Sequence, residues 1–231
     1  MAIRSKRYNE SVKILDSDSV YSIRDAVAKL KKFKQPKFDQ TVDMVFRLGV
    51  DPRHSDQAVR GTVMLPHGVG KKVRVLVFAK GADAEKAKEA GADFVGYDDL
   101  IEKVKGGWLE FDAAVATPDA MRDIGKLGRV LGPRGLMPTP KSGTVTKDVV
   151  SAVTELKAGK IDFRVDKAAN VHVPIGKVSF AEPKIVDNAV AVYQAIMKAK
   201  PATAKGVYMK GCSLSATMSP GIKIDANSFK E

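Results

Sequence analysis

The stretch Leu65-Pro66-His67-Gly68-Val69-Gly70 separates two different patterns of apolar residues. Before it, residues 38–48 alternate between apolar and polar side chains, which is typical of a strand with one buried face. After it, residues 73–79 are almost continuously apolar, as expected of a strand that is covered on both faces. Because proline and glycine interrupt regular structure, the stretch predicts a crossing from one domain into another.

The middle of the chain alternates predicted strands with predicted helices. The strands are expected at residues 73–79, 93–95 and 111–116, and the helices at residues 83–90, 98–105, 118–127 and 147–157. We expect Thr146 to cap the last of these helices. Alternation at this spacing indicates βαβ units and a small parallel sheet, so the middle segment is predicted to be an inserted, Rossmann-like α/β domain.

Both ends of the chain show the pattern of an antiparallel sheet. After Ala158-Gly159-Lys160, residues 161–165 alternate again, and residues 171–173 are the expected partner strand. Strands are also expected at residues 61–65, 207–217 and 222–224. Ser22 begins one helix, and Pro183 begins another with an apolar stripe made by Ile185, Val186, Ala189, Tyr193, Ile196 and Met197. The two ends, residues 1–66 and 160–231, therefore predict one discontinuous α+β domain with helices on one face of its sheet, and residues 67–159 predict the insert.

Charge is distributed unevenly between these segments. The chain has a net charge of +12 and a pI near 9.6. Lys and Arg outnumber Asp and Glu by 13 to 8 in residues 1–66 and by 11 to 6 in residues 160–231, but only by 15 to 13 in residues 67–159. A basic terminal domain indicates a polyanionic partner such as RNA. The alternative is a solvated surface with an excess of lysine.

The sequence contains few of the motifs that are typical of an enzyme active site. His54, His67 and His172 show no metal-ligand spacing with one another or with Cys212, so no metal is predicted. A nucleotide-dependent enzyme that uses the Rossmann-like insert is the alternative function, but no glycine fingerprint follows a strand there. No cofactor is predicted. No apolar run approaches the ~20 residues of a membrane span, and the single cysteine suits a cytosolic protein.

Residues 131–145, LGPRGLMPTPKSGTV, contain three prolines and three glycines and cannot form a regular element. We expect a stiff loop that packs Leu136 and Met137 against the insert and projects Arg134 and Lys141. This segment resembles the signature segment of the L-one family of large-subunit ribosomal proteins. The resemblance continues through KFDQTVDM at 37–44, LGVDPRHSDQAVRGTVMLPHGVGK at 48–71, EAGADFVG at 89–96, FDAAVATPD at 111–119, DFRVDKAANVHVPIGKVSF at 162–180 and ATMSPGIKID at 216–225.

The resemblance implies a function in the ribosome. In this family the two ends of the chain form one domain that grips large-subunit rRNA, and the inserted domain hinges away from it. The family forms the mobile stalk beside the exit site and helps deacylated tRNA to leave. Its bacterial members also repress translation of their own operon mRNA. The resemblance therefore implies a cytoplasmic protein that is a monomer within the ribosome and is not an enzyme.

The resemblance also implies particular site residues. The residues expected to contact RNA are Lys37, Phe38, Thr41, Arg53, Arg164, Asp166, Lys167, Ser213, Ser215, Thr217, Met218 and Gly221. Arg134 and Lys141 are candidates for tRNA contact, and Pro66, Gly68, Gly70 and Gly159 are the expected hinge residues.

Three of these positions carry specific expectations. Phe38 either contacts RNA or packs into the core beside Val42 and Met44. Asp166 is expected to orient a cation or to bond a ribose hydroxyl rather than to touch phosphate. Ser219 stands where the family usually has glycine, and it would be strained if the backbone there needs a positive φ.

Overall fold

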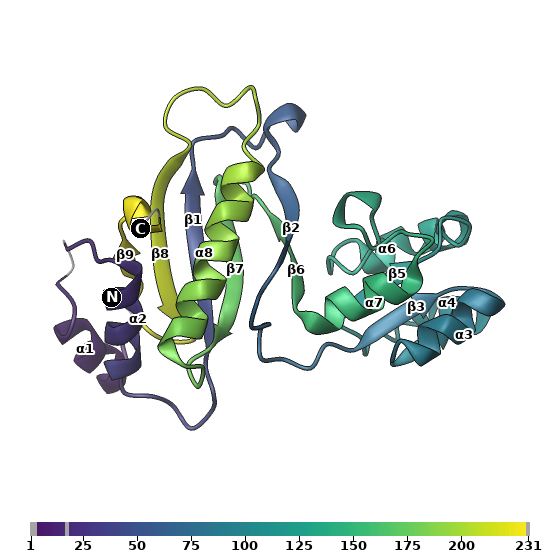
Figure 1. Ribbon diagram of the computed structural model, residues 1–231, viewed down its shortest axis with the longest axis horizontal. Coiled ribbons are helices and arrows are strands. Elements are labelled where there is room, and N and C mark those ends of the chain that lie inside the picture. Colours follow the sequence, from purple (N-terminus) through teal and green to yellow (C-terminus); the bar gives the residue numbers. More distant parts are fainter. Residues whose placement is uncertain (1–3, 17–18, 230–231) are drawn as a thin grey trace. The chain divides into compact units, whose positions relative to one another are not determined.

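The computed structural model describes residues 4–16 and 19–229. The chain forms two compact units. One, the terminal unit, contains both ends of the chain, up to Gly70 and from Ile161 onward; the other, the inserted unit, is Lys71–Lys160. Figure 1 shows the elements of each unit, coloured along the sequence.

The terminal unit contains a four-stranded sheet in the order β7-β1-β8-β9, in which every neighbouring pair is antiparallel. Its strands are β1 (Thr41–Leu48), β7 (Asn170–Lys177), β8 (Met209–Ala216) and β9 (Ile222–Ile224). The helices of this unit are α1 (Lys6–Lys13), α2 (Ile23–Lys32) and α8 (Glu182–Lys198). In Figure 1, α8 lies in front of β1 and β7.

The alternating pattern of β1 decides which face of this sheet is buried. Val42, Met44 and Phe46 are completely buried, whereas the residues between them are not. These side chains join apolar residues of β7, β8, α2 and α8 in one hydrophobic cluster, so the helices cover one face of the sheet. Burying each large apolar side chain contributes about 1.5–3 kcal/mol. The prediction of an antiparallel sheet with helices is confirmed.

The two long helices of this unit begin where local sequence signals place them. Ser22 caps α2, because its hydroxyl accepts a hydrogen bond of 3.2 Å from the backbone N–H of Asp25. Pro183 lies in the first turn of α8, where its missing N–H costs nothing. The prediction that Met197 belongs to the buried apolar stripe is wrong, since this residue is 38% exposed. It follows the fully buried Ile196, and successive side chains of a helix point about 100° apart.

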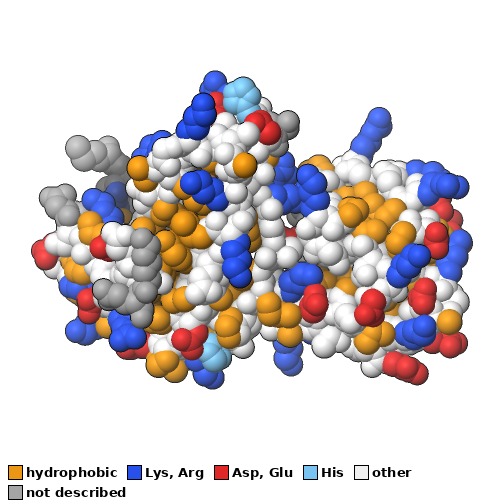
Figure 2. Space-filling view, turned by 45° about the horizontal axis from the view of Figure 1, so that its top comes forward, with side chains coloured by type: hydrophobic (Ala, Val, Ile, Leu, Met, Phe, Trp, Pro, Cys, Tyr) orange, Lys and Arg blue, Asp and Glu red, His pale blue; other side chains and the backbone are white. Residues whose placement is uncertain are grey.

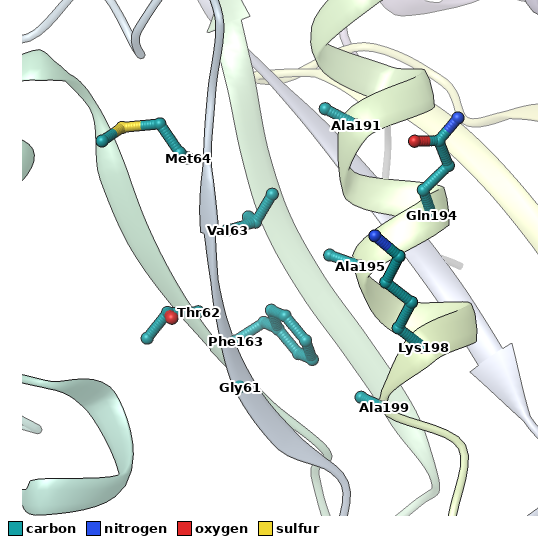
Figure 3. A pocket seen from close by; sticks show the side chains of 10 residues that line it. All are labelled: Gly61, Thr62, Val63, Met64, Phe163, Ala191, Gln194, Ala195, Lys198 and Ala199. Carbon is teal, nitrogen blue, oxygen red and sulfur yellow. The ribbon is translucent and has the colours of Figure 1, made fainter.

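A separate two-stranded sheet joins β2 (Arg60–Met64) to β6 (Lys160–Arg164). The prediction that residues 171–173 pair with residues 161–165 is therefore wrong, since only an isolated bridge between Val165 and Val171 connects the segments. The ring of Phe163 covers Gly61, where an added Cβ would lie 2.7 Å from the ring. Figure 3 shows this ring at a shallow groove between β2 and α8, which exposes alanines and Lys198.

The inserted unit has a parallel sheet in the order β4-β3-β5. Its strands are β3 (Val75–Phe78), β4 (Phe94–Gly96) and β5 (Ala113–Ala116), and its helices are α3 (Ala82–Glu89), α4 (Asp98–Lys105), α5 (Met121–Ile124), α6 (Gly128–Leu131) and α7 (Val149–Ala158). Val75 and Val77 of β3 belong to a cluster with α3 and α7, whereas Leu76 and Phe78 belong to a second cluster with α4, α5 and α6. A strand covered on both faces explains the continuous apolar run, and the predicted small parallel sheet is confirmed.

Three local predictions are wrong or incomplete. Asp148 rather than Thr146 caps α7, because its carboxylate accepts a hydrogen bond from the backbone N–H of Ser151 at 3.2 Å. The helix expected at residues 118–127 is divided into α5, a 3₁₀ turn and α6. No pattern predicted α1, which is a short basic helix capped by Ser5.

Candidate nucleic-acid interface

The face of the four-stranded sheet opposite to the helices carries hydroxyl and charged groups. The strand register places Ser215 and Pro174 on either side of Asp43, and Ser213 and His172 on either side of Val45. We call this surface the uncovered face. Side chains of a strand alternate between its two sides, so the residues of β1 that lie on this face are Thr41, Asp43, Val45 and Arg47.

At one end of the uncovered face, the chain after β8 is bonded to the start of β1. The backbone N–H of Thr217 donates to the carbonyl of Thr41 at 3.1 Å. The buried side chain of Gln40 donates to the carbonyl of Thr217. On the other side, the ammonium of Lys177 donates to the hydroxyl of Thr41 at 2.9 Å. A lysine and two threonines are thus held together at this end.

Met218 follows Thr217 in an unusual conformation. Its φ is +65°, and its side chain is 67% exposed. A non-glycine residue in this left-handed region costs about 1–2 kcal/mol, and such strain is concentrated at functional sites. The structure therefore presents an apolar side chain to solvent from a strained turn, which is a suitable geometry for contact with a ribose or an unstacked base.

The expectation about Ser219 is corrected by the same turn. The positive φ belongs to Met218 and not to Ser219. Instead, the hydroxyl of Ser219 accepts a hydrogen bond from the backbone N–H of Ala216 at 2.8 Å, and its own backbone N–H donates to the carbonyl of Ala216 at 2.9 Å. Ser219 therefore closes the turn that displays Met218 and is not strained.

Phe38 and Lys37 lie in the bend before β1. Phe38 is 50% exposed, whereas Val42 and Met44 are completely buried. The alternative that Phe38 packs into the core beside them is therefore wrong. Its exposed ring is available to stack on a base, as aromatic side chains do in RNA-binding surfaces.

Asp166 and Lys167 lie in the turn before β7. The carboxylate of Asp166 accepts hydrogen bonds of 2.8 Å from the backbone N–H groups of Ala168 and Asn170. The bond from Asn170 is the largest cause that lowers the pKa of Asp166. Asp166 thus builds the turn that exposes Lys167, a role that the sequence did not predict.

The other expected contact residues lie on different elements. Arg164 is exposed on β6, and Arg53 is exposed in the loop after β1, where its backbone N–H donates to Asp51. Gly221 precedes β9. Ser213 and Ser215 lie on the uncovered face, half-buried. The structure brings together Thr41, Ser213, Ser215 and Thr217, whereas Arg53 and Arg164 are outside the four-stranded sheet.

Sequence reasoning missed four residues of the uncovered face: Asp43, Arg47, His172 and Lys177. The first two have the same parity as Thr41 along β1, which is a signal that could have identified them. Partial burial raises the pKa of Asp43, and the positive charges of His172 and Lys177 oppose that rise. A half-buried carboxylate among hydroxyls and cations suits hydrogen-bond donors of RNA rather than its phosphates.

Charge alone does not locate this face. Figure 2 shows Lys and Arg side chains spread widely over the surface in that view, with Asp and Glu among them. Surface cations contribute to affinity for any polyanion and carry little information about position. The hydroxyls and the strained methionine at one end are the features that distinguish the uncovered face.

The proline-rich loop of the inserted unit is stiffened by a network of hydroxyls. The hydroxyl of Thr139 lies 2.7 Å from that of Ser142, which lies 2.9 Å from that of Thr144. Leu136 and Met137 pack against the core of this unit, as expected. Arg134 and Lys141 are exposed on the same loop.

The expected hinge residues occupy special backbone positions. Gly68, Gly70 and Gly159 have positive φ angles of 62°, 74° and 112°, which favour glycine, and Gly159 ends α7. Pro66 is exposed just before the first two.

Asn188 of α8 fixes the start of this segment. It is completely buried, and its side chain accepts from the N–H of His67 at 3.1 Å and donates to the carbonyls of Gly68 and Ile175 at 3.0 and 2.8 Å. His67 also pairs with the exposed Asp187 at 3.0 Å. The chain that leaves the terminal unit is thereby tied to α8 as far as Gly68.

The described parts of the chain contain no group of three His, Cys, Asp or Glu side chains that could hold a metal ion. Burial raises the pKa of the Cys212 thiol to about 12, so this side chain stays protonated and is unsuited to act as a nucleophile. Within residues 4–16 and 19–229, no helix has both the length and the apolar character needed to span a membrane.

Comparison with known protein families identifies a match over most of the chain. Residues 30–220 match the family described as "Ribosomal protein L1p/L10e family". The match begins in α2, includes the whole inserted unit, and ends beside the Met218 turn.

Proposed function

Because the chain belongs to the ribosomal protein L1p/L10e family, whose members are structural proteins that bind ribosomal RNA and not enzymes, we propose that its uncovered face holds large-subunit rRNA. The observation that carries this proposal is the strained, exposed Met218 beside Thr41, Thr217 and Lys177. Two hydroxyls and a cation can bond phosphates and 2′-hydroxyls, while the methionine contacts a ribose or base.

Two features support recognition of RNA shape by a pre-formed surface. The uncovered face consists of strands whose other side is packed into the core, so the backbone positions of its side chains are fixed before binding. Gln40 and Ser219 fix the Thr217–Met218 turn from beneath. Groups that are already ordered lose little entropy on binding, and this increases affinity without further contacts.

A pair of lysine substitutions tests the location of the interface. Lys177→Gln removes a cation from the uncovered face, and Lys198→Gln removes one from α8, on the opposite side of the sheet. We expect the wild-type affinity for an rRNA stalk fragment to fall with salt at a log–log slope of about −3 to −6, if roughly five phosphates are engaged. Lys177→Gln should reduce that slope by about one, and Lys198→Gln should leave it unchanged. Equal effects of the two substitutions would contradict the assignment.

We further propose that the two units have separate functions. The terminal unit anchors the protein to the rRNA, and the inserted unit swings beside the exit site and helps deacylated tRNA to leave. The positive φ angles of Gly70 and Gly159 at the two connections, and the clamp by Asn188 that ends at Gly68, support a hinge at residues 69–71 and 159–160. Arg134 and Lys141 are the candidates for contact with tRNA.

Replacement of residues 71–160 by a short flexible linker tests this division. The shortened chain should keep its affinity for the rRNA stalk fragment and lose any contribution to tRNA release. A shortened chain that folds but no longer binds the fragment would show that the inserted unit contributes to rRNA recognition.

We also propose that the same face binds the mRNA of the protein's own operon and represses its translation, because one RNA-binding surface can accept a second RNA of similar shape. In a cell-free translation reaction, added protein should then reduce synthesis from its own mRNA. Met218→Asp should relieve that repression together with rRNA binding.

A further inference from the structure

A hollow lies at the other end of the uncovered face from Thr41 and Met218. It is open to solvent, with a volume of about 570 Å³, and its lining includes Val45, Arg47, Asn170, Met209, Gly211 and Ser213. Arg47 lies six positions after Thr41 on an extended strand, so the hollow is about 20 Å from the Thr41 end. We call it the Arg47 hollow. None of the residues expected to contact RNA defines it except Ser213, at its edge.

The shape of the Arg47 hollow follows from one glycine. Gly211 of β8 pairs with Arg47 of β1, and Arg47 pairs with Asn170 of β7 on its other side. A Cβ added to Gly211 would meet nothing within 4 Å, so the space above the strand at this point is open. The absence of a side chain here creates room on a surface that is otherwise covered by alternate residues of each strand.

The lining of the hollow combines an apolar surface with cations. Val45 and Met209 are half-buried in it, and Val20, which also lines it, is 59% exposed. Arg47 and Lys223 are exposed beside them. The carboxylate of Asp225, which also lines the hollow, accepts a hydrogen bond from the backbone N–H of Asn227 at 2.9 Å. Cations therefore outnumber the one acidic group, which already has a backbone partner.

We propose that the Arg47 hollow binds an unpaired nucleobase of the RNA that the uncovered face holds, an inference that rests on the proposed function. A nucleobase has an apolar face that suits Val45 and Met209, and it is attached to a phosphate that Arg47 can reach. The hollow is continuous with the rest of the uncovered face through Val45 and Ser213, so one RNA can occupy both. A base here would fix the register of the RNA on the sheet, because only an unstacked base exposes its apolar face to Val45 and Met209.

Gly211 provides a direct test, since a Cβ added there enters open space and a larger side chain extends from it into the hollow. Gly211→Leu should fill it, and Gly211→Ala is the matched control that adds only one carbon. Because stacking of one base contributes about 1–3 kcal/mol, we expect Gly211→Leu to weaken binding of an rRNA stalk fragment by about five- to 150-fold. Gly211→Ala should change the affinity less than threefold. Gly211→Ala should unfold like the wild type, because a Cβ there meets nothing within 4 Å. Thermal unfolding of Gly211→Leu checks that the longer side chain leaves the fold intact.

Abasic RNA identifies the occupant. Each unpaired nucleotide of the fragment is replaced in turn by an abasic one, and affinity is measured for the wild type and for Gly211→Leu. At one position, the abasic substitution should weaken binding to the wild type but should not weaken binding to Gly211→Leu any further. Such non-additivity is what a double-mutant cycle shows for two partners in contact. Wild-type affinity in Gly211→Leu, or additive losses at every abasic position, would overturn the inference and leave the proposed function intact. If the wild type binds the fragment no better than random RNA, the proposed function itself fails.

Discussion

Replacement of Met218 should separate the stability of this protein from its affinity for RNA. Met218 has a φ of +65°, a conformation that costs a methionine about 1–2 kcal/mol. Asparagine adopts it more readily, because its short polar side chain can bond to the local backbone. Only about a third of the methionine side chain is shielded from solvent, so little packing is lost. We therefore expect Met218→Asn to leave the free energy of unfolding unchanged or to raise it by about 0.5–1 kcal/mol.

The same substitution should weaken binding to RNA. Complete burial of a methionine contributes about 1.5–3 kcal/mol. Since 67% of the side chain is exposed in the free protein, binding can bury at most this fraction, which corresponds to about 1–2 kcal/mol. The expected loss of affinity for the rRNA stalk fragment is about five- to thirtyfold. Fluorescence anisotropy with a labelled fragment measures the affinity, and urea unfolding of the free protein measures the stability.

Met197 supplies the matched control. It is 38% exposed on α8, which packs on the other side of the sheet. Met197→Asn should lower the stability by about 1–2 kcal/mol, because asparagine is a poor helix former and the shielded part of the methionine loses apolar contact, and it should leave RNA affinity unchanged. The reasoning is refuted if Met218→Asn binds RNA as tightly as the wild type, or if the two substitutions weaken binding equally.

Three further predictions concern stability. Asn188→Ala should cost about 2–4 kcal/mol, because it removes three hydrogen bonds and leaves the buried carbonyl of Ile175 without this partner. Faster hydrogen exchange at His67 would report the loss, and an unchanged rate would count against the clamp. The hydrogen bond from Lys71 is the largest cause that lowers the pKa of Asp112 to about 2, so its stabilisation is present above pH 3.8 and is lost as the pH falls towards 2. Asp112→Asn should therefore lower the stability of the inserted unit by roughly 1–2 kcal/mol at pH 7 and by almost nothing near pH 2. The fluorescence of Trp108 reports the unfolding of this unit, and a loss of stability that is independent of pH would be contrary to the prediction. Burial raises the pKa of Asp43, so the folded state binds more protons than the unfolded state and stability falls as the pH rises through the shifted value. Asp43→Asn should thus be more stable than the wild type at neutral pH and equally stable below pH 3.8. Urea unfolding of both proteins at the two pH values measures this, and equal stabilities at neutral pH would disprove it.

Local signals in the sequence predicted most of the elements. The alternation of β1, the Ser22 cap of α2 and the two-sided burial of β3 each depend on residues that are close together in the chain. Pairing between distant segments was harder to predict. Residues 161–165 and 171–173 are neighbours in sequence, but β6 pairs with β2 and β7 pairs with β1. Nothing within either strand specifies which distant partner it will meet.

The Lys6–Lys13 helix was missed for a different reason. Its sequence, KRYNESVK, contains few apolar residues, so it has no stripe of the kind that identifies a helix. The Ser5 cap and the hydrogen bond from Ser11 to the carbonyl of Arg7 support it locally. A helical period of apolar residues indicates a helix with one buried face, so a short exposed helix can form without such a pattern.

The candidate site shows most clearly what a sequence leaves out. Strict alternation along β7 would turn Lys177 towards the helices, because Ile175 is completely buried and lies two residues before it. The register shifts between Val42 and Asp43, so that Ile175 is the extra residue of a bulge and Thr41 pairs with Lys177. Gly176 permits this, since its φ is 152° and a Cβ there would lie 3.0 Å from the ring of Phe180. One irregular residue thus reverses the orientation of the next and puts an ammonium beside the hydroxyl of Thr41. Composition supplies the positive charge of this protein, but the bulge decides that a lysine lies on the face that RNA is proposed to bind.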